Sequence, residues 1–109
     1  KIKENFKKIE TIHWGNIPDF DLIINATSLG LNINDDLKLN YEKIDKNKYF
    51  YDVIYNPKET NFLKKARLHG HSTINGKMMF IYQAHQSFTI WHKVMPKIDE
   101  ETLKLIDND

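Results

Sequence analysis

Polar side chains that follow a short apolar segment are the first residues of this sequence that could do chemistry. Residues 22–24 are apolar without alternation, which is typical of a strand covered on both faces in a parallel sheet. Asn25, Thr27 and Ser28 follow directly. Ligands of open α/β sheets bind beyond the carboxyl ends of the strands, so this amide and these hydroxyls could meet one. The alternative is a polar turn that ends a buried strand, and this segment alone slightly favours the turn.

A second polar segment, from Tyr55 to Thr60, follows the aromatic and β-branched run at residues 49–55. The Tyr55 hydroxyl could contact a ligand there, and the backbone near Val53 could approach a flat ring. The commoner alternative is that Tyr55 only ends the strand and packs on a neighbour.

The third candidate is Gly76 with the helix that follows it. A glycine before a helix lets a ligand approach the backbone, where amide groups point outward. Gln83 is an uncharged amide among apolar residues of that helix, and a ligand hydroxyl could pair with it if it is buried. Alternatively, Gln83 faces solvent or bonds a backbone carbonyl. Met78 and Met79 are expected to fill the core.

Other chemistries receive little support from the sequence. His69 and His71 are two residues apart without a nearby carboxylate, so surface histidines are favoured over a metal site. His85 and His92 are weak evidence for the same reason. Neither GxGxxG nor GxxxxGK[ST] occurs, and no serine lies in a nucleophile elbow. We therefore predict no metal ligands, and no arrangement of Ser, His and Asp is convincing as a nucleophilic site.

Length and composition limit the class of protein. The 109 residues suffice for one small domain, and 16 basic against 15 acidic side chains give a net charge of +1. This balance provides no field that would attract nucleic acid. No apolar run is long enough to span a membrane, and no signal peptide is recognised. The absence of cysteine fits a reducing compartment, so we expect a cytoplasmic protein.

Periodicity and breaker residues predict an α/β domain with a mainly parallel sheet. Helices are expected over residues 1–9, from a cap at Thr60 to Gly70, over 77–92, and after a cap at Asp99, and the loop before residue 49 is expected to hold at most a short helix over 41–45. Strands are expected over residues 11–14, 21–24, 49–55 and 71–75.

Three blocks of residues, in this order and spacing, resemble the C-terminal part of the shikimate dehydrogenases. The resemblance extends from about Asp21 to Trp91. The blocks are Asn25-Ala26-Thr27-Ser28-Leu29-Gly30-Leu31, then Asp52-Val53-Ile54-Tyr55-Asn56-Pro57 with Thr60 and Leu63, then Gly76 with Met79, Gln83, Ala84, Phe88 and Trp91.

This resemblance implies an enzyme of two domains that reduces 3-dehydroshikimate to shikimate with NADPH, in the biosynthesis of aromatic amino acids. Its C-terminal domain is a Rossmann-like cofactor binder. By resemblance, the cofactor contacts are Thr27, Val53, Gly76 and Met79. Tyr55 and Gln83 are expected to reach the substrate, shikimate or 3-dehydroshikimate. The catalytic lysine and aspartate belong to the N-terminal substrate domain, which is not in this sequence.

Several features leave alternatives open. Met78 stands where the family often has a second glycine, and the loop that recognises the 2′-phosphate of NADP is absent. A quinate/shikimate dehydrogenase paralogue that uses NAD therefore remains an alternative. A non-catalytic α/β interaction module, binding a protein through residues 77–92, is another. We expect residues 1–109 to form a partial nucleotide-binding domain, with helices in 77–109 that pack on the missing substrate domain.

The strand order 3-2-1-4-5-6 has a physical consequence for such a partial domain. Residues 11–14 would be strand 3 and the strand at Asp21 strand 4, so the strands between them are missing. The Asp21 strand would then have an unpaired apolar edge, which is a template for association. We expect this edge to pair with a second copy, giving a homodimer, or with residues 11–14.

Overall fold

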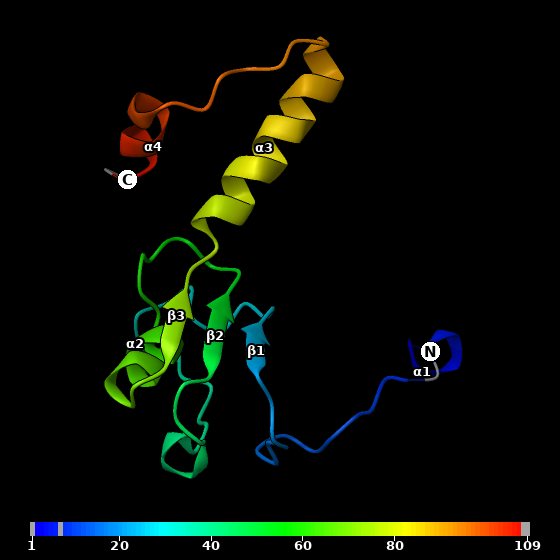
Figure 1. Cartoon of the computed structure of the whole chain (residues 1–109), viewed down its shortest axis with the longest axis vertical. Coiled ribbons are helices and arrows are strands. Elements are labelled where there is room, and N and C mark those ends of the chain that lie inside the picture. The colour runs from blue at the N-terminus through cyan, green and yellow to red at the C-terminus, as the bar shows by residue number, and fades with distance from the viewer. Residues whose placement is uncertain (1, 7, 108–109) are drawn as a thin grey trace.

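A three-stranded parallel sheet is the centre of the computed structural model, which describes residues 2–6 and 8–107. The strands β1 (Leu22–Asn25), β2 (Tyr49–Asp52) and β3 (Ser72–Ile74) lie in the order β1-β2-β3 (Figure 1). Ile24 is opposite Tyr51, and Tyr51 is opposite Ile74. This confirms the predicted α/β fold class and the adjacency of the three strands that the Rossmann-like order requires.

The hydrophobic core lies on one face of this sheet. Helix α2 (Asn61–Leu68) and the connection from β1 to β2, which includes the 3-10 turn η1 (Tyr41–Lys43), cover that face. Phe50 is fully buried at its centre. The rings packed around Phe50, with centroids 4.8–5.9 Å away, are those of Phe20, Tyr41, Phe62 and His71. Burying each large apolar side chain stabilises the fold by about 1.5–3 kcal/mol.

Both ends of α2 are formed as the sequence predicts. The Thr60 hydroxyl accepts a hydrogen bond from the Leu63 amide at 3.4 Å, which caps the first turn. Gly70 follows the last turn with φ of +86°, a conformation that side chains disfavour. The His71 amide then donates to the Ala66 carbonyl, and the chain enters β3.

The opposite face of the sheet is uncovered in the described part of the chain. Apolar and aromatic side chains stand half-exposed on it, namely Leu22, Ile24, Tyr49 and Ile74. The apolar run of β1 predicted that other elements of the chain would cover both faces of the sheet. The described residues supply only one covering layer, because the connections on either side of β2 pass over the same face.

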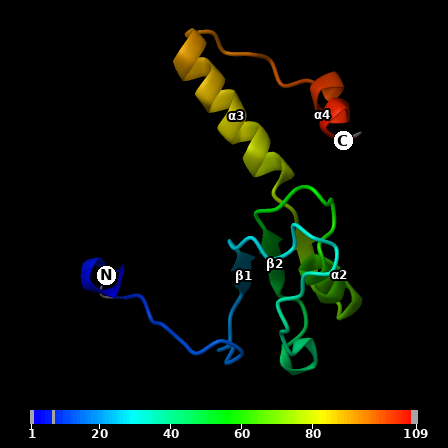
Figure 2. The same ribbon diagram turned by 180° about the vertical axis from the view of Figure 1, so that it is seen from behind.

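Helices α3 (Lys77–His92) and α4 (Glu100–Asp107) form an arm that leaves the sheet (Figures 1 and 2). The Cα radius of gyration is 16.8 Å, against about 13 Å for a compact domain of this length. Asp99 caps α4, as predicted, by accepting hydrogen bonds from the Thr102 amide and hydroxyl at 2.9 Å. None of the helices among the described residues is long and apolar enough to cross a membrane.

The N-terminal segment differs most from the sequence prediction. Helix α1 spans only Ile2–Asn5, and positions 1 and 7 of the expected helix over 1–9 lie outside the described residues. Residues 11–14 form no strand, and their side chains are exposed. The prediction that they pair with the edge of β1 is therefore wrong. An extended segment without neighbouring strands has no partners for its backbone groups. Strand β2 also ends earlier than expected, at Asp52 rather than Tyr55.

Candidate functional site

The carboxyl ends of the three strands meet at one edge of the sheet, and backbone hydrogen bonds join the segments that follow them. The Val53 amide donates to the Asn25 carbonyl at 3.1 Å. The Gly76 amide donates to the Ile54 carbonyl at 3.0 Å. The structure thus brings Thr27, Val53 and Gly76 to the same edge, where an α/β sheet binds its ligands.

Gly76 is a glycine because two backbones touch at this position. Its φ of −77° is open to any residue, so conformational freedom does not explain it. A Cβ atom at Gly76 would instead overlap the carbonyl group of Val53. The sequence suggested that this glycine admits a ligand to the backbone. The space is occupied by Val53, and Gly76 is buried, so the missing side chain allows close contact between the segments that follow β2 and β3.

The side chain of Asn25 organises the loop that contains Thr27. Its Oδ1 accepts hydrogen bonds from the Thr27 hydroxyl at 2.7 Å and the Thr27 amide at 3.1 Å. Its Nδ2 donates to the Leu29 carbonyl at 2.9 Å. Asn25 is therefore buried and engaged within the chain, and its amide does not face a ligand as one reading of the sequence suggested. The Thr27 side chain remains exposed.

Asp52 is the polar residue at this edge that the sequence reasoning missed. Its carboxylate is fully buried. It accepts hydrogen bonds from the Thr60 hydroxyl at 2.7 Å, the Ile54 amide at 3.0 Å, and Asn25 Nδ2 at 3.2 and 3.3 Å. A charged residue inside an aromatic strand could have signalled it, because Asp is almost never fully buried without partners.

The predicted substrate residues lie where the arm meets the sheet. The rings of Tyr55 and Phe80 stack, with centroids 4.5 Å apart, so Tyr55 packs on a neighbour as the alternative reading expected. Met79 and Gln83 are four residues apart on α3 and share a face. Both side chains are exposed, and Gln83 is thus not the buried amide that the sequence allowed for.

Two titratable groups near the site, Asp35 and His71, have pKa values shifted by their surroundings. Asp35 Oδ2 accepts hydrogen bonds from the Gly30 and Asn32 amides, which lower the pKa of Asp35 and close the loop after Thr27. His71, next to β3, is buried, and this burial together with nearby His69 lowers its pKa. The described residues contain no group of three His, Cys, Asp or Glu that could hold a metal ion.

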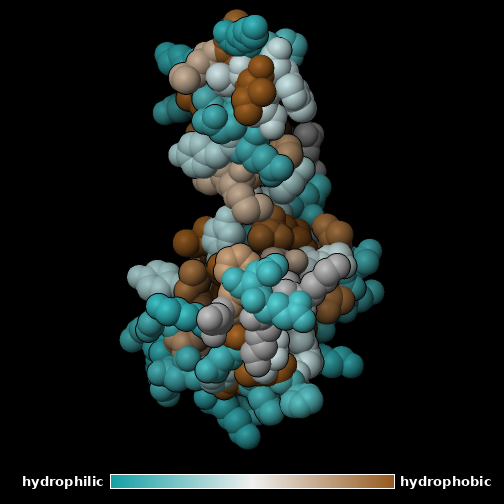
Figure 3. All heavy atoms as spheres, turned by 90° about the vertical axis from the view of Figure 1, so that its right-hand side faces the viewer, coloured by the Kyte–Doolittle hydropathy of each residue, from teal (hydrophilic) through white to brown (hydrophobic). Residues whose placement is uncertain are grey.

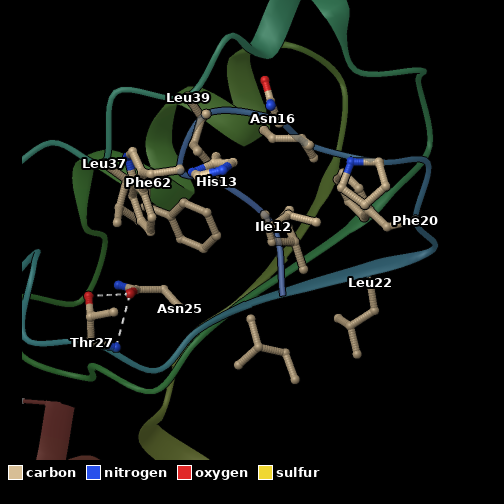
Figure 4. A pocket seen from close by; sticks show the side chains of 16 residues that line it. Ile12, His13, Asn16, Phe20, Leu22, Asn25, Thr27, Leu37, Leu39 and Phe62 are labelled. Carbon is tan, nitrogen blue, oxygen red and sulfur yellow. Dashed lines mark hydrogen bonds between the residues drawn. The ribbon is translucent and has the colours of Figure 1, made fainter. Parts of the chain in front are cut away.

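A hollow of about 320 Å³ opens beside β1 rather than beside Val53 and Gly76 (Figure 4). Asn25 and Thr27 stand at one end of it, and the segment that includes Ile12 and His13 crosses its other side. Its lining is mostly apolar and includes Leu22, Leu37, Leu39 and Phe62. The hollow therefore lies along the unpaired edge of the sheet.

Ion pairing fixes α4 near the start of α3. Lys77 Nζ lies 2.6 Å from Asp107 Oδ1 and 3.2 Å from the Leu103 carbonyl oxygen. This lysine lowers the pKa of Asp107. A small hollow of about 60 Å³ between α4 and the segment at Tyr55 is lined by Lys58, Lys77 and Asp107. The end of α4 thus lies next to the predicted substrate side of the edge.

Comparisons with known proteins agree with this geometry. No family model matches the chain. It is 59% identical over 107 residues to a shikimate dehydrogenase (NADP(+)) of Pelagibacter ubique, which covers 98% of the chain and 40% of that relative. It superposes with a TM-score of 0.70 on a shikimate dehydrogenase solved in complex with NADP+, at 41% identity, covering 81% of this chain and 31% of that one. A 5-ketofructose reductase of Gluconobacter is similar at 31% identity, with a TM-score of 0.67, covering 81% and 32%.

The parallel sheet, with the segments that follow its three strands meeting at one edge, defines a Rossmann-like α/β fold. The chain spans about two fifths of the length of the curated relative from Pelagibacter. It belongs to the shikimate dehydrogenase family and corresponds to the C-terminal part of its members. The resemblance read from the three sequence blocks is confirmed.

Proposed function

We propose that this chain is the nicotinamide-binding part of an NADP-dependent shikimate dehydrogenase, which reduces 3-dehydroshikimate to shikimate. The observation that carries the proposal is the contact between Val53 and Gly76 at the carboxyl ends of adjacent parallel strands. It brings main-chain groups of two neighbouring segments together at the edge where α/β sheets bind ligands, and such groups could pair with the amide of a flat ring. Relatives named as NADP(+) enzymes support the choice of cofactor.

In this proposal each predicted residue has a separate role. The Val53 and Gly76 backbones meet the carboxamide of the nicotinamide, Met79 borders the ring, and Thr27 lies beside the cofactor. The cofactor supplies the hydride. Tyr55, on the sheet side, and Gln83, on the arm, orient the substrate through their hydroxyl and amide groups. Proton transfer to the substrate oxygen falls to groups of the substrate domain.

The exposed surfaces suggest how the rest of the enzyme is arranged. We propose that residues 1–109 are a partial nucleotide-binding domain and that the helices in 77–109 pack on a substrate domain. Support comes from α3, in which Ile81 alone is buried. Figure 3 shows apolar side chains gathered over the upper end of the sheet-bearing part, beneath the narrower arm. We further propose that the enzyme works in the cytoplasm.

The experiment is an assay of the complete protein that contains this segment. Reduction of NADP+ at 340 nm is measured with shikimate and with quinate, and again with NAD+ in place of NADP+. Turnover of shikimate with NADP+ is expected, with little turnover of quinate. Preference for quinate and NAD+ would favour the paralogue, and turnover with neither would favour a non-catalytic interaction module.

The isolated chain is expected to have no dehydrogenase activity, since the groups that transfer the proton lie outside it. Measurable turnover of shikimate by the purified 109-residue chain would contradict this.

The unpaired edge of β1 supports one further proposal for the isolated chain. Leu22 and Ile24 are half-exposed there, and a parallel strand with free backbone groups associates readily. We propose that two copies pair through this edge when the rest of the domain is absent. Light scattering should show a dimer at high concentration, with slow amide exchange in β1. A monomer with freely exchanging β1 amides would contradict the pairing.

A further inference from the structure

We infer that Asp52 is a positioning residue for the cofactor, because its buried carboxylate holds three segments of the site edge in one arrangement. The inference rests on the proposed function and concerns a residue that the family resemblance did not assign. These segments carry Thr27, Val53 and Gly76; the Asn25 side chain links the carboxylate to the first, and the Ile54 backbone links it to the other two. Asp52 itself lies behind them, as the last residue of β2.

The first observation is the environment of the carboxylate. Asp52 is 0% exposed, and its hydrogen-bond donors are the neutral Asn25 amide, Ile54 amide and Thr60 hydroxyl. A buried carboxylate is costly unless donors surround it, so the three donors are drawn to it and fixed by it. They belong to β1, to the turn after β2 and to the N-terminus of α2. One side chain therefore joins three elements.

The link to Thr27 runs through the two ends of the Asn25 side chain. An amide has a donor end and an acceptor end. Since the Asp52 carboxylate can only accept, it requires Asn25 Nδ2 to face it. The Asn25 Oδ1 atom then faces the other way and accepts from the amide and hydroxyl of Thr27. The charge of Asp52 thus decides which way Asn25 holds the Thr27 loop.

The link to Val53 and Gly76 runs through the turn after β2. Asp52 Oδ1 accepts from the Ile54 amide two residues on, and this contact bends the chain at Val53. The Ile54 carbonyl then accepts from the Gly76 amide, and the Val53 carbonyl packs on Gly76. Loss of the hydrogen bond between Asp52 and the Ile54 amide would free the Val53 and Gly76 backbone groups, which the proposal assigns to the nicotinamide.

Asparagine at position 52 could not replace the aspartate. Its side chain has one acceptor oxygen for three donors, and its own amide would face the amide of Asn25. One donor would stay unpaired, or Asn25 would turn and release Thr27. Hydride transfer depends on near-contact geometry, in which a displacement of about 1 Å can cost about 100-fold in rate.

The test uses the complete enzyme, with residues numbered as here. Asp52→Asn is expected to lower kcat/KM for NADP+ by about 10- to 100-fold. The Kd of adenosine 2′,5′-bisphosphate, a probe of the adenine side alone, should stay within about twofold. Asp21→Asn is the matched control on the exposed end of the same sheet and should leave all constants unchanged. Thr60→Val, which removes one donor, should cost about 5-fold, and Thr60→Ser should restore most of it.

The outcomes separate this inference from the function on which it rests. A wild-type enzyme that does not use NADP+ would overturn the proposed function and the inference together. With an active wild type, a folded Asp52→Asn enzyme with unchanged kcat/KM for NADP+ would overturn the inference alone, as would an equal loss of affinity for the bisphosphate. If Asp52→Asn does not fold, Thr60→Val decides, because wild-type kinetics in that variant would overturn the inference.

Discussion

The sheet with α2 and the arm of α3 and α4 have similar shares of apolar residues but use them differently. In the first region, Phe50, Phe62, Leu63 and Ala66 are nearly free of solvent. In the arm, Trp91 is 76% exposed, and most other large apolar side chains of α3 are exposed too. The first region completes its own core, whereas the arm carries a surface that needs another body to cover it.

This difference separates the region that stabilises the chain from the region where the candidate site lies. The site edge lies at the junction, with Val53 and Tyr55 on the sheet side and Met79 and Gln83 on the arm. The sheet fixes the backbone groups rigidly. The arm presents side chains whose setting depends on what packs against it. Substitutions in the two regions should therefore differ most in their effect on the stability of the isolated chain.

The largest effect is expected in the core. Phe50→Ala removes a fully buried ring and should lower the free energy of unfolding by about 3–5 kcal/mol. Trp91→Ala, the matched substitution in the arm, should change it by less than about 0.5 kcal/mol. Urea denaturation followed by far-UV circular dichroism measures both. Equal losses would show that the arm is part of the same core, contrary to the comparison.

A smaller effect is expected at the junction. Gly76→Ala places a methyl group against the Val53 carbonyl and should cost about 1–3 kcal/mol. Amide exchange of residue 76 should accelerate as its hydrogen bond to Ile54 weakens. Gly70→Ala is the control, because its cost of about 1 kcal/mol comes from a φ of +86° with open space around it. It should leave the amide of residue 76 protected, and faster exchange there would argue against a local contact.

The buried histidine should make the core region sensitive to acid. The pKa of His71 is lowered in the folded state, so the unfolded chain binds the proton more readily. From about pH 6.5 down to the folded-state pKa, the free energy of unfolding should therefore fall as the pH falls.

Urea midpoints measured between pH 7 and pH 5 test this prediction. His71→Leu should remove much of the slope. His13→Ala, at an exposed position, should keep it. A slope unchanged by His71→Leu would assign the acid sensitivity to other groups.

The smallest effect is expected within the arm. Asp107→Asn weakens a partly exposed ion pair with Lys77 and should change the free energy of unfolding least of the four substitutions. Its main consequence should be faster proteolysis in the connection at residues 93–99, because α4 is held less firmly. Glu101→Gln, on the exposed side of α4, serves as the control. Destabilisation of the sheet by Asp107→Asn would mean that the two regions unfold together.

Local chemistry made much of the fold predictable. Thr60, Gly70 and Asp99 each act within one helical turn, and the helices they bound were predicted correctly. The residues after each strand were also predicted to lie at one edge, since parallel strands share their direction. The prediction of a strand over residues 11–14 was wrong, because a strand forms only beside a neighbouring strand, which the local sequence does not supply.

The sequence by itself determined the class of sheet, the boundaries of α2 and α3, the start of α4 and the residues that follow each strand. Only the tertiary structure revealed that Gly76 is required by Val53, that Asn25 and Asp52 face each other, and that α3 stands uncovered. The physical reason is the sequence separation over which each interaction acts. Caps, turns and periodicity act over a few residues, whereas these contacts join positions more than 20 residues apart that only folding brings together.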